Sequence, residues 1–545
     1  MSPRPQQDPT DWVTRAADQA IRHAGDSLTG DRVITCASGA SPSGPVHLGN
    51  MREFMTVHFV ADEIKRRGIP ARHLHSWDDY DRFRKVPAGV DPSWSEHIGR
   101  PLSAVPDPWE CHVSWAEHFK APLLAAMDEL GVEMEQISQT EQYRAGTYRA
   151  EILRAVANRG AIEEILAAHR TKKGSATDDP LARFPYKPYC ADCGRDTTTA
   201  TSFSDDSLEL AYVCRFCGYH GRTNLETEDG GKLVWKVDWP MRWAYEQVDF
   251  EPGGADHATP GSSYTVGKEI VKLFDYRAPS FLEYGFVGFD GLQKMSSSAG
   301  AVPTAADALE ILEPSIVRWL YVRRNPKQTF DIDFGPSVVR LYDEWDALSR
   351  KATDPSKRDV AVLAQERASA TAAGPLPTSP VTVPFRVLSS VADVTAGSAD
   401  LISSIVSSVG YPHESVSDLE PRLGKAMSWT LTYVPPADRT TVRTSPAPRL
   451  SSLSETESQW LSLLLGGLEE PLDIEPVTEL VYGVPKLARG MGLADPPTDE
   501  VKADQKAFFA LLYDLLVDAE RGPRLPTLIV ALGLDKVRSL LTPAG

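Results

Sequence analysis

Hydrophobic positions along the first hundred residues repeat with two periods. Apolar side chains recur at helical spacing over 11–24 and again over 51–67, whereas 32–36 and 72–77 are short segments of strand type. A strand, a helix and a second strand in this order predict a βαβ unit with a right-handed crossover. The pattern therefore predicts a parallel sheet near the start of the chain.

The pattern changes along the rest of the chain. Strands are predicted at 234–240 and 281–289, with a loop rich in Gly and Pro at 250–261 and a serine-capped helix that ends at 274. After residue 304 the spacing is helical. We expect helices over 305–313, 314–322, 338–351, 385–408, 418–433, 455–466, 477–489, 498–520 and 526–541.

Length, charge and hydropathy exclude several classes of protein. A chain of 545 residues is too long for one domain. Its net charge of −18 argues against a sequence-independent nucleic-acid coat protein, although a local basic groove is still possible. No apolar run could span a bilayer, and residues 1–10 lack the apolar core of a signal peptide. We expect a cytoplasmic monomer with no membrane partner.

Four of the six cysteines form two C-x-x-C pairs, Cys190 with Cys193 and Cys214 with Cys217. Each pair can form a tight turn whose thiolates point at one ion, and residues 199–213 can form the returning ribbon. Four thiolates would close the coordination sphere, so the pattern favours structural zinc. Redox chemistry is the alternative.

A second group of metal-ligating side chains is compressed into twelve residues. It comprises Asp107, Cys111, His112 and His118. These side chains are a plausible tetrahedral set for zinc. The alternative is the edge of a helix that carries two histidines without any ion.

The stretch 38–50 joins the first predicted strand to the following helix. It is rich in Gly and Ser and has one histidine, His47, at the helix entrance. Small residues allow close approach of the backbone, and a helix N-terminus favours phosphate. The loop from Lys294 to Ser298 adds a cation and hydroxyls. We expect a nucleotide to be held between these two stretches.

These two stretches resemble the ATP-binding motifs of class I aminoacyl-tRNA synthetases. The motifs read Pro45-Val46-His47-Leu48-Gly49-Asn50 and Lys294-Met295-Ser296-Ser297-Ser298. Longer blocks at 77–87, 237–243 and 256–264 are similar to one family of that class, the class I lysyl-tRNA synthetases. The chain departs from the class pattern at Asn50, where the class has His, and at Ser297, where the class has a second Lys.

The resemblance implies an α/β Rossmann-type parallel-sheet catalytic domain with a zinc-binding insertion, followed by an all-α C-terminal domain. The implied boundaries are 1–95 and 233–303 for the two halves of the catalytic domain, 96–232 for the insertion, 304–352 for a helical connector, 353–384 for a helix and linker, and 385–545 for an α-helical anticodon-binding domain. It also implies two zinc sites, at the clusters of Asp107 and of Cys190.

The resemblance further implies that the chain is a lysine–tRNA ligase, with ATP, Mg²⁺, L-lysine and tRNA(Lys) as reactants and partners. ATP and lysine would form lysyl-adenylate, and the terminal adenosine of the tRNA would then attack the activated carbonyl. A diverged paralogue with a non-translational role and an inactive tRNA-binding protein are the alternatives.

Particular residues follow from the resemblance. His47, Asn50 and Lys294 would be catalytic and would bind ATP together with Pro45, Gly49, Met295, Ser296, Ser297 and Ser298. Lysine would contact Gly39, Ser41, Asp78, Trp235, His257 and Tyr284, although Trp235 could equally be a core residue. The tRNA would contact Arg318, Arg323, Arg324 and Lys327, unless these lie on a solvated face.

Overall fold

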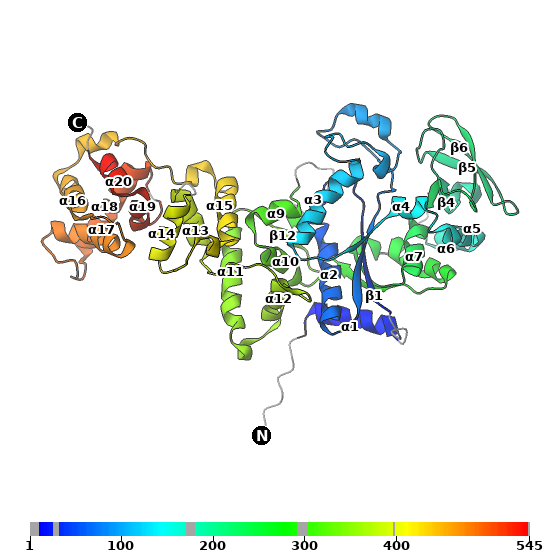
Figure 1. The fold of residues 1–545 in the computed structure, drawn as a ribbon, viewed down its shortest axis with the longest axis horizontal. Helices are drawn as coiled ribbons and strands as arrows, with labels where there is room; N and C mark the ends of the chain where they lie inside the picture. The colour runs from blue at the N-terminus through cyan, green and yellow to red at the C-terminus, as the bar shows by residue number, and fades with distance from the viewer. Residues whose placement is uncertain are drawn as a thin grey trace, which may run out of the picture. The chain divides into compact units, whose positions relative to one another are not determined.

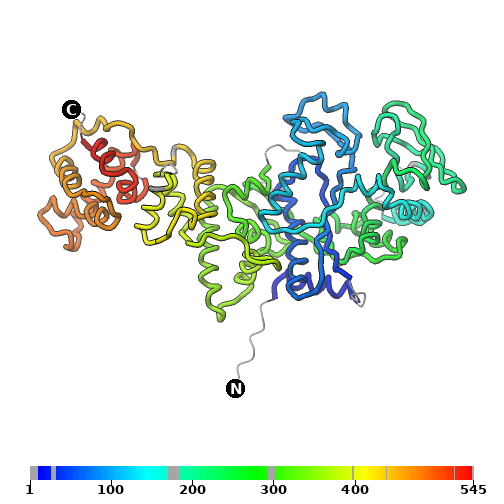
Figure 2. Tube along the Cα trace, in the orientation of Figure 1, coloured from blue at the N-terminus to red at the C-terminus, as the bar shows by residue number. Residues whose placement is uncertain are grey.

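The structure is a computed structural model that describes residues 10–25, 32–169, 180–291, 302–395, 398–520 and 522–542 (Figures 1 and 2). The chain divides into two compact units. Unit 1 comprises Met1–Leu309, Pro314–Asp333 and Leu348–Leu376, and unit 2 comprises Glu310–Glu313, Phe334–Ala347 and Pro377–Gly545.

Unit 1 contains a five-stranded parallel sheet, which confirms the predicted fold class of its first part. The spatial order is β10-β9-β1-β2-β3. The strands are β1 Ile34–Ala40, β2 Ala71–Trp77, β3 Glu135–Ser138, β9 Val248–Gly254 and β10 Ser280–Tyr284. The order reverses between β1 and β9, and open α/β sheets bind ligands at the carboxyl ends of the strands beside such a reversal.

Helices cover both faces of this sheet. Helices α1 (Trp12–Ala24) and α2 (Met51–Arg66) pack with Cys36 of β1, whereas the adjacent residue Ala37 packs with Trp243 on the opposite side. Successive side chains of a strand point to opposite faces, so β1 is buried on both. That double burial agrees with a sequence made of small and apolar residues.

The predicted strand at 234–240 is wrong, because these residues begin helix α7, Trp235–Tyr245. Valine and tryptophan favour strands. However, Val237 and Met241 lie four residues apart and are both buried on one face of the helix. Local β-propensity is therefore overridden by packing.

The true strand of the sheet, β9, includes residues of the stretch predicted as a loop. Gly253 is required there because a Cβ would lie 2.7 Å from the ring of Phe281. The glycines of this segment therefore reflect close packing against β10. The predicted strand at 281–289 is also divided, since Gly285 separates β10 from β11.

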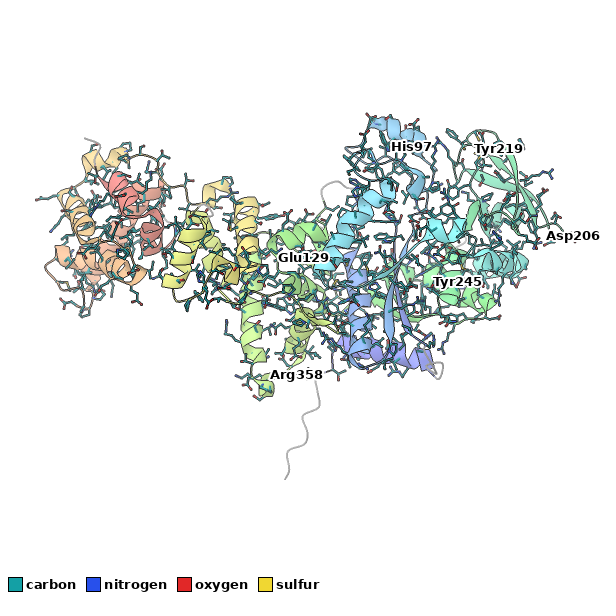
Figure 3. The ribbon with its side chains drawn as sticks, viewed as in Figure 1. His97, Glu129, Asp206, Tyr219, Tyr245 and Arg358 are labelled. Atoms are coloured by element: carbon teal, nitrogen blue, oxygen red, sulfur yellow. The ribbon has the colours of Figure 1, made fainter. Side chains whose placement is uncertain are left out.

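The remaining elements of unit 1 surround the sheet. The helices are α3 Trp115–Glu129, α4 Gln139–Arg144, α5 Arg149–Ala157, α6 Arg159–Ala168, α8 Ser263–Ile270, α10 Pro314–Val322 and α12 Val360–Ser369. The strands are β4 Tyr186–Pro188, β5 Thr198–Ser204, β6 Glu209–Cys214, β7 His220–Asn224, β8 Gly231–Leu233, β11 Val287–Phe289, β12 Phe330–Ile332, β13 Ala370–Thr371 and β14 Gly374–Pro375. Strands β5, β6 and β7 form the predicted ribbon, at whose surface Asp206 and Tyr219 lie (Figure 3).

Arg318 cannot contact tRNA, which corrects that prediction. It is fully buried, and it donates hydrogen bonds to four backbone carbonyls and to Nε2 of His58, the last at 2.7 Å. Arg367 is a second buried arginine of unit 1. It donates to both carboxylate oxygens of Asp11 and is also paired with Glu63. Both arginines join segments distant in the sequence.

The described residues of unit 2 form helices and no strand, as predicted for the C-terminal region. Helix α9 (Ala305–Ile311) ends in unit 2, and α11 (Ser337–Ala352) begins there. The others are α13 Phe385–Thr395, α14 Ala399–Ser408, α15 Arg422–Tyr433, α16 Glu455–Gly467, α17 Ile474–Ala488, α18 Asp499–Val517, α19 Leu525–Leu532 and α20 Leu534–Leu541. Arg422 is buried between the carboxylates of Glu313 and Asp346, at 2.6 and 2.8 Å. Among the described helices of the whole chain, none is both long and apolar enough to cross a membrane.

Candidate active site

A large pocket lies where β1 turns into α2, and we call it the glycine-rich pocket. It encloses about 1450 Å³ of space, part of it open to solvent. Its lining includes Gly39, Ser41, Pro45, His47, Gly49, Asn50, Glu53, Asp256, His257 and Tyr284. The predicted nucleotide-binding residues that the structure describes therefore all line one pocket. Lys294, Met295, Ser296, Ser297 and Ser298 lie outside the described residues.

His47 and Asn50 form the entrance to α2. The Asn50 side chain accepts a hydrogen bond from the backbone N–H of His47 at 3.2 Å, which fixes the turn. Burial lowers the pKa of the His47 imidazole, so the ring is neutral at pH 7. Its Nδ1 is buried without a partner among the described residues. The imidazole can therefore act as a neutral hydrogen-bonding group toward a ligand.

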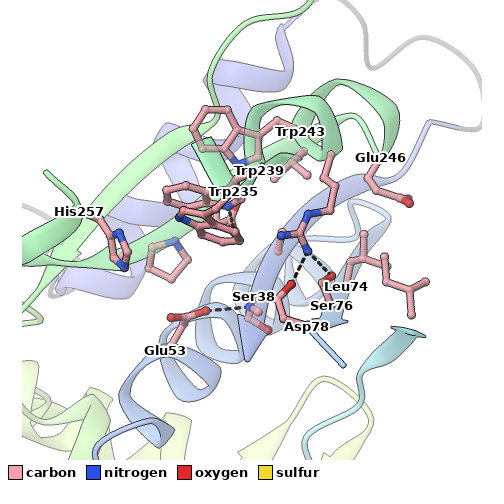
Figure 4. Close-up of a pocket in the computed structure, with 18 residues that line it drawn as sticks. Ser38, Glu53, Leu74, Ser76, Asp78, Trp235, Trp239, Trp243, Glu246 and His257 are labelled. Atoms are coloured by element: carbon pink, nitrogen blue, oxygen red, sulfur yellow. Dashed lines mark hydrogen bonds and ion pairs between the residues drawn. The ribbon is translucent and has the colours of Figure 1, made fainter. Parts of the chain in front are cut away.

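A second pocket lies directly beside the first, and we call it the acidic pocket. It encloses about 660 Å³, part of it open to solvent, and shares Gly39, Glu53 and His257 with the glycine-rich pocket. Figure 4 shows Trp235, Trp239 and Trp243 of α7 across the pocket from Glu53, Ser38 and Asp78. Among the described residues, the lining carries four carboxylates, Glu53, Asp78, Glu246 and Glu251, and one cationic side chain, Arg242.

Asp78 is held at the end of β2 by Arg242. The guanidinium donates to Asp78 Oδ1 at 2.9 Å and to the hydroxyl of Ser76 at 2.7 Å, and it lies 3.1 Å from Asp238. Burial raises the pKa of Asp78, against the effect of Arg242. Sequence reasoning identified Asp78 but not Arg242, whose position depends on the helix that was predicted as a strand.

Glu53 and Glu251 are buried carboxylates that sequence reasoning missed. Glu53 accepts hydrogen bonds from the N–H of Gly39 at 2.8 Å and the hydroxyl of Tyr284 at 2.7 Å. Glu251 accepts from the indole N–H groups of Trp239 and Trp243. Burial raises the pKa of each carboxyl to about 7.

Neither of these two carboxylates has a cation in direct contact among the described residues. Glu53 lies three residues after Asn50, which is the only signal in the sequence that could have indicated it. Together, Glu53 and Glu251 make the acidic pocket attractive to a cationic ligand.

Aromatic rings form the other wall of the acidic pocket. Trp235 is stacked on Trp239 with ring centroids 5.3 Å apart, and His257 meets Trp239 edge-on at 5.5 Å. Trp235 is 37% exposed, so it is available to a ligand and is not a core residue. Of the six residues predicted for lysine, Ser41 and Tyr284 line the glycine-rich pocket, Asp78 and Trp235 the acidic pocket, and Gly39 and His257 both.

The two predicted metal clusters are assembled in three dimensions. In each, the four possible ligand atoms lie within 4.8 Å of one another. Sulfur atoms of Cys190 and Cys217 are 3.6 Å apart and those of Cys193 and Cys214 are 3.7 Å apart. A tetrahedral zinc with Zn–S bonds of about 2.3 Å would place them about 3.8 Å apart. The thiols therefore fit one zinc ion.

The cluster at Asp107 is more open. Sγ of Cys111 lies 3.1 Å from Nδ1 of His112 and 3.2 Å from Nδ1 of His118, and Oδ1 of Asp107 lies 3.3 Å from Nδ1 of His118. Carboxylate, thiolate and imidazole are all zinc ligands. The donor set therefore fits zinc as well.

Comparison with known proteins agrees with this geometry. Residues 10–372 match the family model described as tRNA synthetases class I (K), and the chain belongs to this family. The expected family is thus confirmed.

Three relatives that align with nearly the whole chain are each named lysine–tRNA ligase. A lysine–tRNA ligase of Streptomyces coelicolor is 49% identical, with 98% of each chain covered. The lysine–tRNA ligase of Thermococcus kodakarensis is 34% identical over 98% of this chain and 99% of its own, and that of Treponema pallidum is 30% identical over 97% and 98%.

Proposed function

We propose that this chain is a lysine–tRNA ligase, which activates L-lysine with ATP and transfers it to the 3′-terminal adenosine of tRNA(Lys). The relatives that match its whole length carry this name. The observation that carries the proposal for this chain is the acidic pocket. Four carboxylates against one arginine, counted over the lining residues that the structure describes, favour a substrate with an additional positive charge.

The glycine-rich pocket is the proposed ATP site. The backbone of the turn and the N-terminus of α2 favour phosphate, since N–H groups and the helix dipole point there. His47 and Asn50 supply polar groups at the same place. Lys294, with Ser296, Ser297 and Ser298, would add a cation from its loop. Mg²⁺ would accompany the triphosphate and neutralise its charge.

The acidic pocket is the proposed lysine site. Oδ1 of Asp78 is occupied by Arg242, so its other oxygen is the proposed acceptor for one ammonium of lysine. Neither Glu53 nor Glu251 forms an ion pair within the described part of the chain, although the charge of Arg242 acts on Glu251, and we assign the second ammonium to this pair. The faces of Trp235 and Trp239 would pack against the alkyl stem, where a cation–π contact adds about 0.5–2 kcal/mol.

The shared residues of the two pockets define where the first step occurs. Gly39, Glu53 and His257 line both, so the lysine carboxylate would meet the α-phosphate at this boundary. The carboxylate attacks phosphorus, and pyrophosphate leaves. No covalent enzyme intermediate is needed, so positioning and stabilisation of developing charge supply the catalysis. The neutral His47 imidazole would hydrogen-bond to a phosphate oxygen.

Both metal clusters are proposed structural zinc sites. When bound, zinc would hold the ribbon loops and the Asp107 loop together, and no ligand position would be left for substrate. We expect two zinc ions per chain by elemental analysis of the purified protein. Replacing Cys193 with Ser should reduce this to one. A zinc content unchanged by that substitution would contradict the assignment.

The test of the proposed function is amino-acid-dependent ATP–pyrophosphate exchange and tRNA charging. All twenty amino acids should be compared, with and without purified tRNA. We expect activity with lysine, abolished in Lys294→Ala. Activity with another amino acid would indicate a diverged paralogue. No exchange under any condition, from a folded zinc-loaded protein that binds tRNA, would indicate an inactive tRNA-binding protein.

A further inference from the structure

The turn that carries His47 is held at Leu48 by residues that are distant in the sequence. Leu48 is fully buried and lies between His47 and Gly49, which both line the glycine-rich pocket. Its backbone N–H donates to the carbonyl of Pro303 at 2.9 Å, and its carbonyl accepts from the hydroxyl of Tyr321 at 2.8 Å. The backbone on both sides of Leu48 is therefore fixed from outside the turn.

The first of these two contacts is prepared by the start of helix α9. Thr304 forms an isolated antiparallel bridge with His47. Oδ2 of Asp307 accepts hydrogen bonds from the backbone N–H and the hydroxyl of Thr304, at 2.7 and 2.8 Å, and the same hydroxyl accepts from the N–H of Asp307 at 3.3 Å. This reciprocal cap fixes the backbone at residues 303–304, because a capped helix start has few alternative conformations.

The second contact comes from the interior of unit 1. Tyr321 lies on helix α10, is 2% exposed, and meets the ring of Phe330 edge-on at 5.9 Å. Packing thus holds the ring in one orientation, with its hydroxyl directed at the Leu48 carbonyl. Neither Tyr321 nor Asp307 lines the glycine-rich pocket or the acidic pocket. Any effect of these two side chains on a bound nucleotide therefore has to pass through the His47 turn.

We propose that Tyr321 and Asp307 are positioning residues, which hold the His47 imidazole in register with the phosphates while lysine is activated. This inference rests on the proposed function. The bond from the His47 N–H to Asn50 orders the turn internally, whereas Tyr321 and the capped start of α9 set its position relative to the rest of unit 1. That position matters for the rate, because a displacement of about 1 Å can cost about 10²-fold.

The experiment is a double-mutant cycle between Tyr321 and His47. Single-turnover formation of lysyl-adenylate, at saturating ATP and lysine, is measured for the full-length wild type, Tyr321→Phe, His47→Ala and the double variant. We expect Tyr321→Phe to lower the rate about tenfold, since one buried hydrogen bond is lost, and to leave the Kd for lysine unchanged. In the His47→Ala background the same substitution should change the rate less than about twofold, because the ring through which it acts is absent.

Two further comparisons separate positioning from general stability. Tyr342→Phe is the matched control: Tyr342 is also fully buried, and its hydroxyl also bonds to the backbone, at Ile311 and Glu313 within unit 2. It should lower the melting temperature without changing the rate. Asp307 is only half-buried, so its substitution does not disturb the core. Asp307→Ala should lower the rate several-fold, whereas Asp307→Asn keeps an acceptor for Thr304 and should retain most of it.

Two results would overturn the inference. If Tyr321→Phe lowers the rate equally with and without His47, the hydroxyl does not act through that ring. If neither Tyr321→Phe nor Asp307→Ala changes the rate, the turn keeps its position without them. Failure of the proposed function would be seen separately, since the wild type would then form no lysyl-adenylate.

Discussion

The glycine-rich pocket and the acidic pocket share a boundary but are built in opposite ways. The first takes most of one wall from a continuous stretch, 39–50, and from backbone and small side chains. The second takes its charged groups from α2, the end of β2, α7 and β9, and each is a buried or half-buried side chain held by another side chain or by the backbone. The difference corresponds to their proposed ligands, because phosphate suits backbone donors whereas a particular amino acid requires particular side chains.

This comparison makes separable predictions. Substitutions in the glycine-rich pocket should affect the rate at which bound lysine is converted to lysyl-adenylate. Changes to the acidic pocket should affect the affinity for lysine and leave ATP affinity nearly constant.

Replacement of His47 by Ala should lower the rate of lysyl-adenylate formation by about 10²–10³-fold, because a positioned donor to developing charge is lost. The KM for lysine should change little. Single-turnover adenylate formation measures the rate, and circular dichroism checks the fold. A large rise in the KM for lysine at an unchanged rate would show that the two pockets are not separable.

Glu251→Gln should weaken lysine binding by about 10- to 100-fold, the cost of removing a charged hydrogen-bond acceptor. The substitution keeps the size of the side chain beside the two indole N–H groups. Isothermal calorimetry with lysine and with an ATP analogue measures both affinities. Glu246→Gln is the matched control, since that half-buried carboxylate already has Arg72 at 3.5 Å, and it should have a much smaller effect.

Lysine affinity should depend on pH through Glu53 and Glu251. The pKa of each is about 7 in the free protein, so ionisation rises from about one-tenth at pH 6 to nine-tenths at pH 8. Only the ionised form attracts an ammonium, and lysine should bind about tenfold more tightly at pH 8 for each carboxylate engaged. A pH-independent Kd would exclude both groups from the lysine site.

The same pKa values affect stability with the opposite sign. Because the folded pKa lies above the ordinary value of 4.5, the folded protein binds more protons, and its stability falls as pH rises from about 4.5 through 7. Bound lysine would offset this loss. Its stabilising effect on the melting temperature should therefore be larger at pH 8 than at pH 6.

Trp235→Phe should have the smallest effect, a loss of about two- to fivefold in lysine affinity, because Phe keeps an aromatic face but offers a weaker cation–π contact. The hydrogen bond from the Trp235 indole to Ser263, at 3.1 Å, is lost as well. Ser263→Ala is a control for that second loss. If both variants weaken lysine binding equally, the ring face of Trp235 does not contribute.

The contrast between the pockets also explains what could be predicted from sequence. The strand, turn and helix around His47 are contiguous, so the pattern alone places them at one site. The parallel sheet and the cysteine ribbon were predictable for the same reason. Glu53 and Glu251 could not be recognised, because their role depends on burial and on partners as distant as Tyr284. Helix α7 was mistaken for a strand because its tryptophans are strand-forming residues that packing holds in a helix.

The clamp formed by Arg367 has a consequence for the order of events on the ribosome. Asp11 is buried and Glu63 is half-buried, and both pair with this arginine, which lies more than 300 residues further along the chain. Glu63 also pairs with Arg67. A nascent chain that ends before residue 367 leaves Asp11 without that cation, and breaking such a buried pair costs about 3–5 kcal/mol. We therefore expect the packing of α1, the first helix to be synthesised, to be completed only after about two-thirds of the chain has been made.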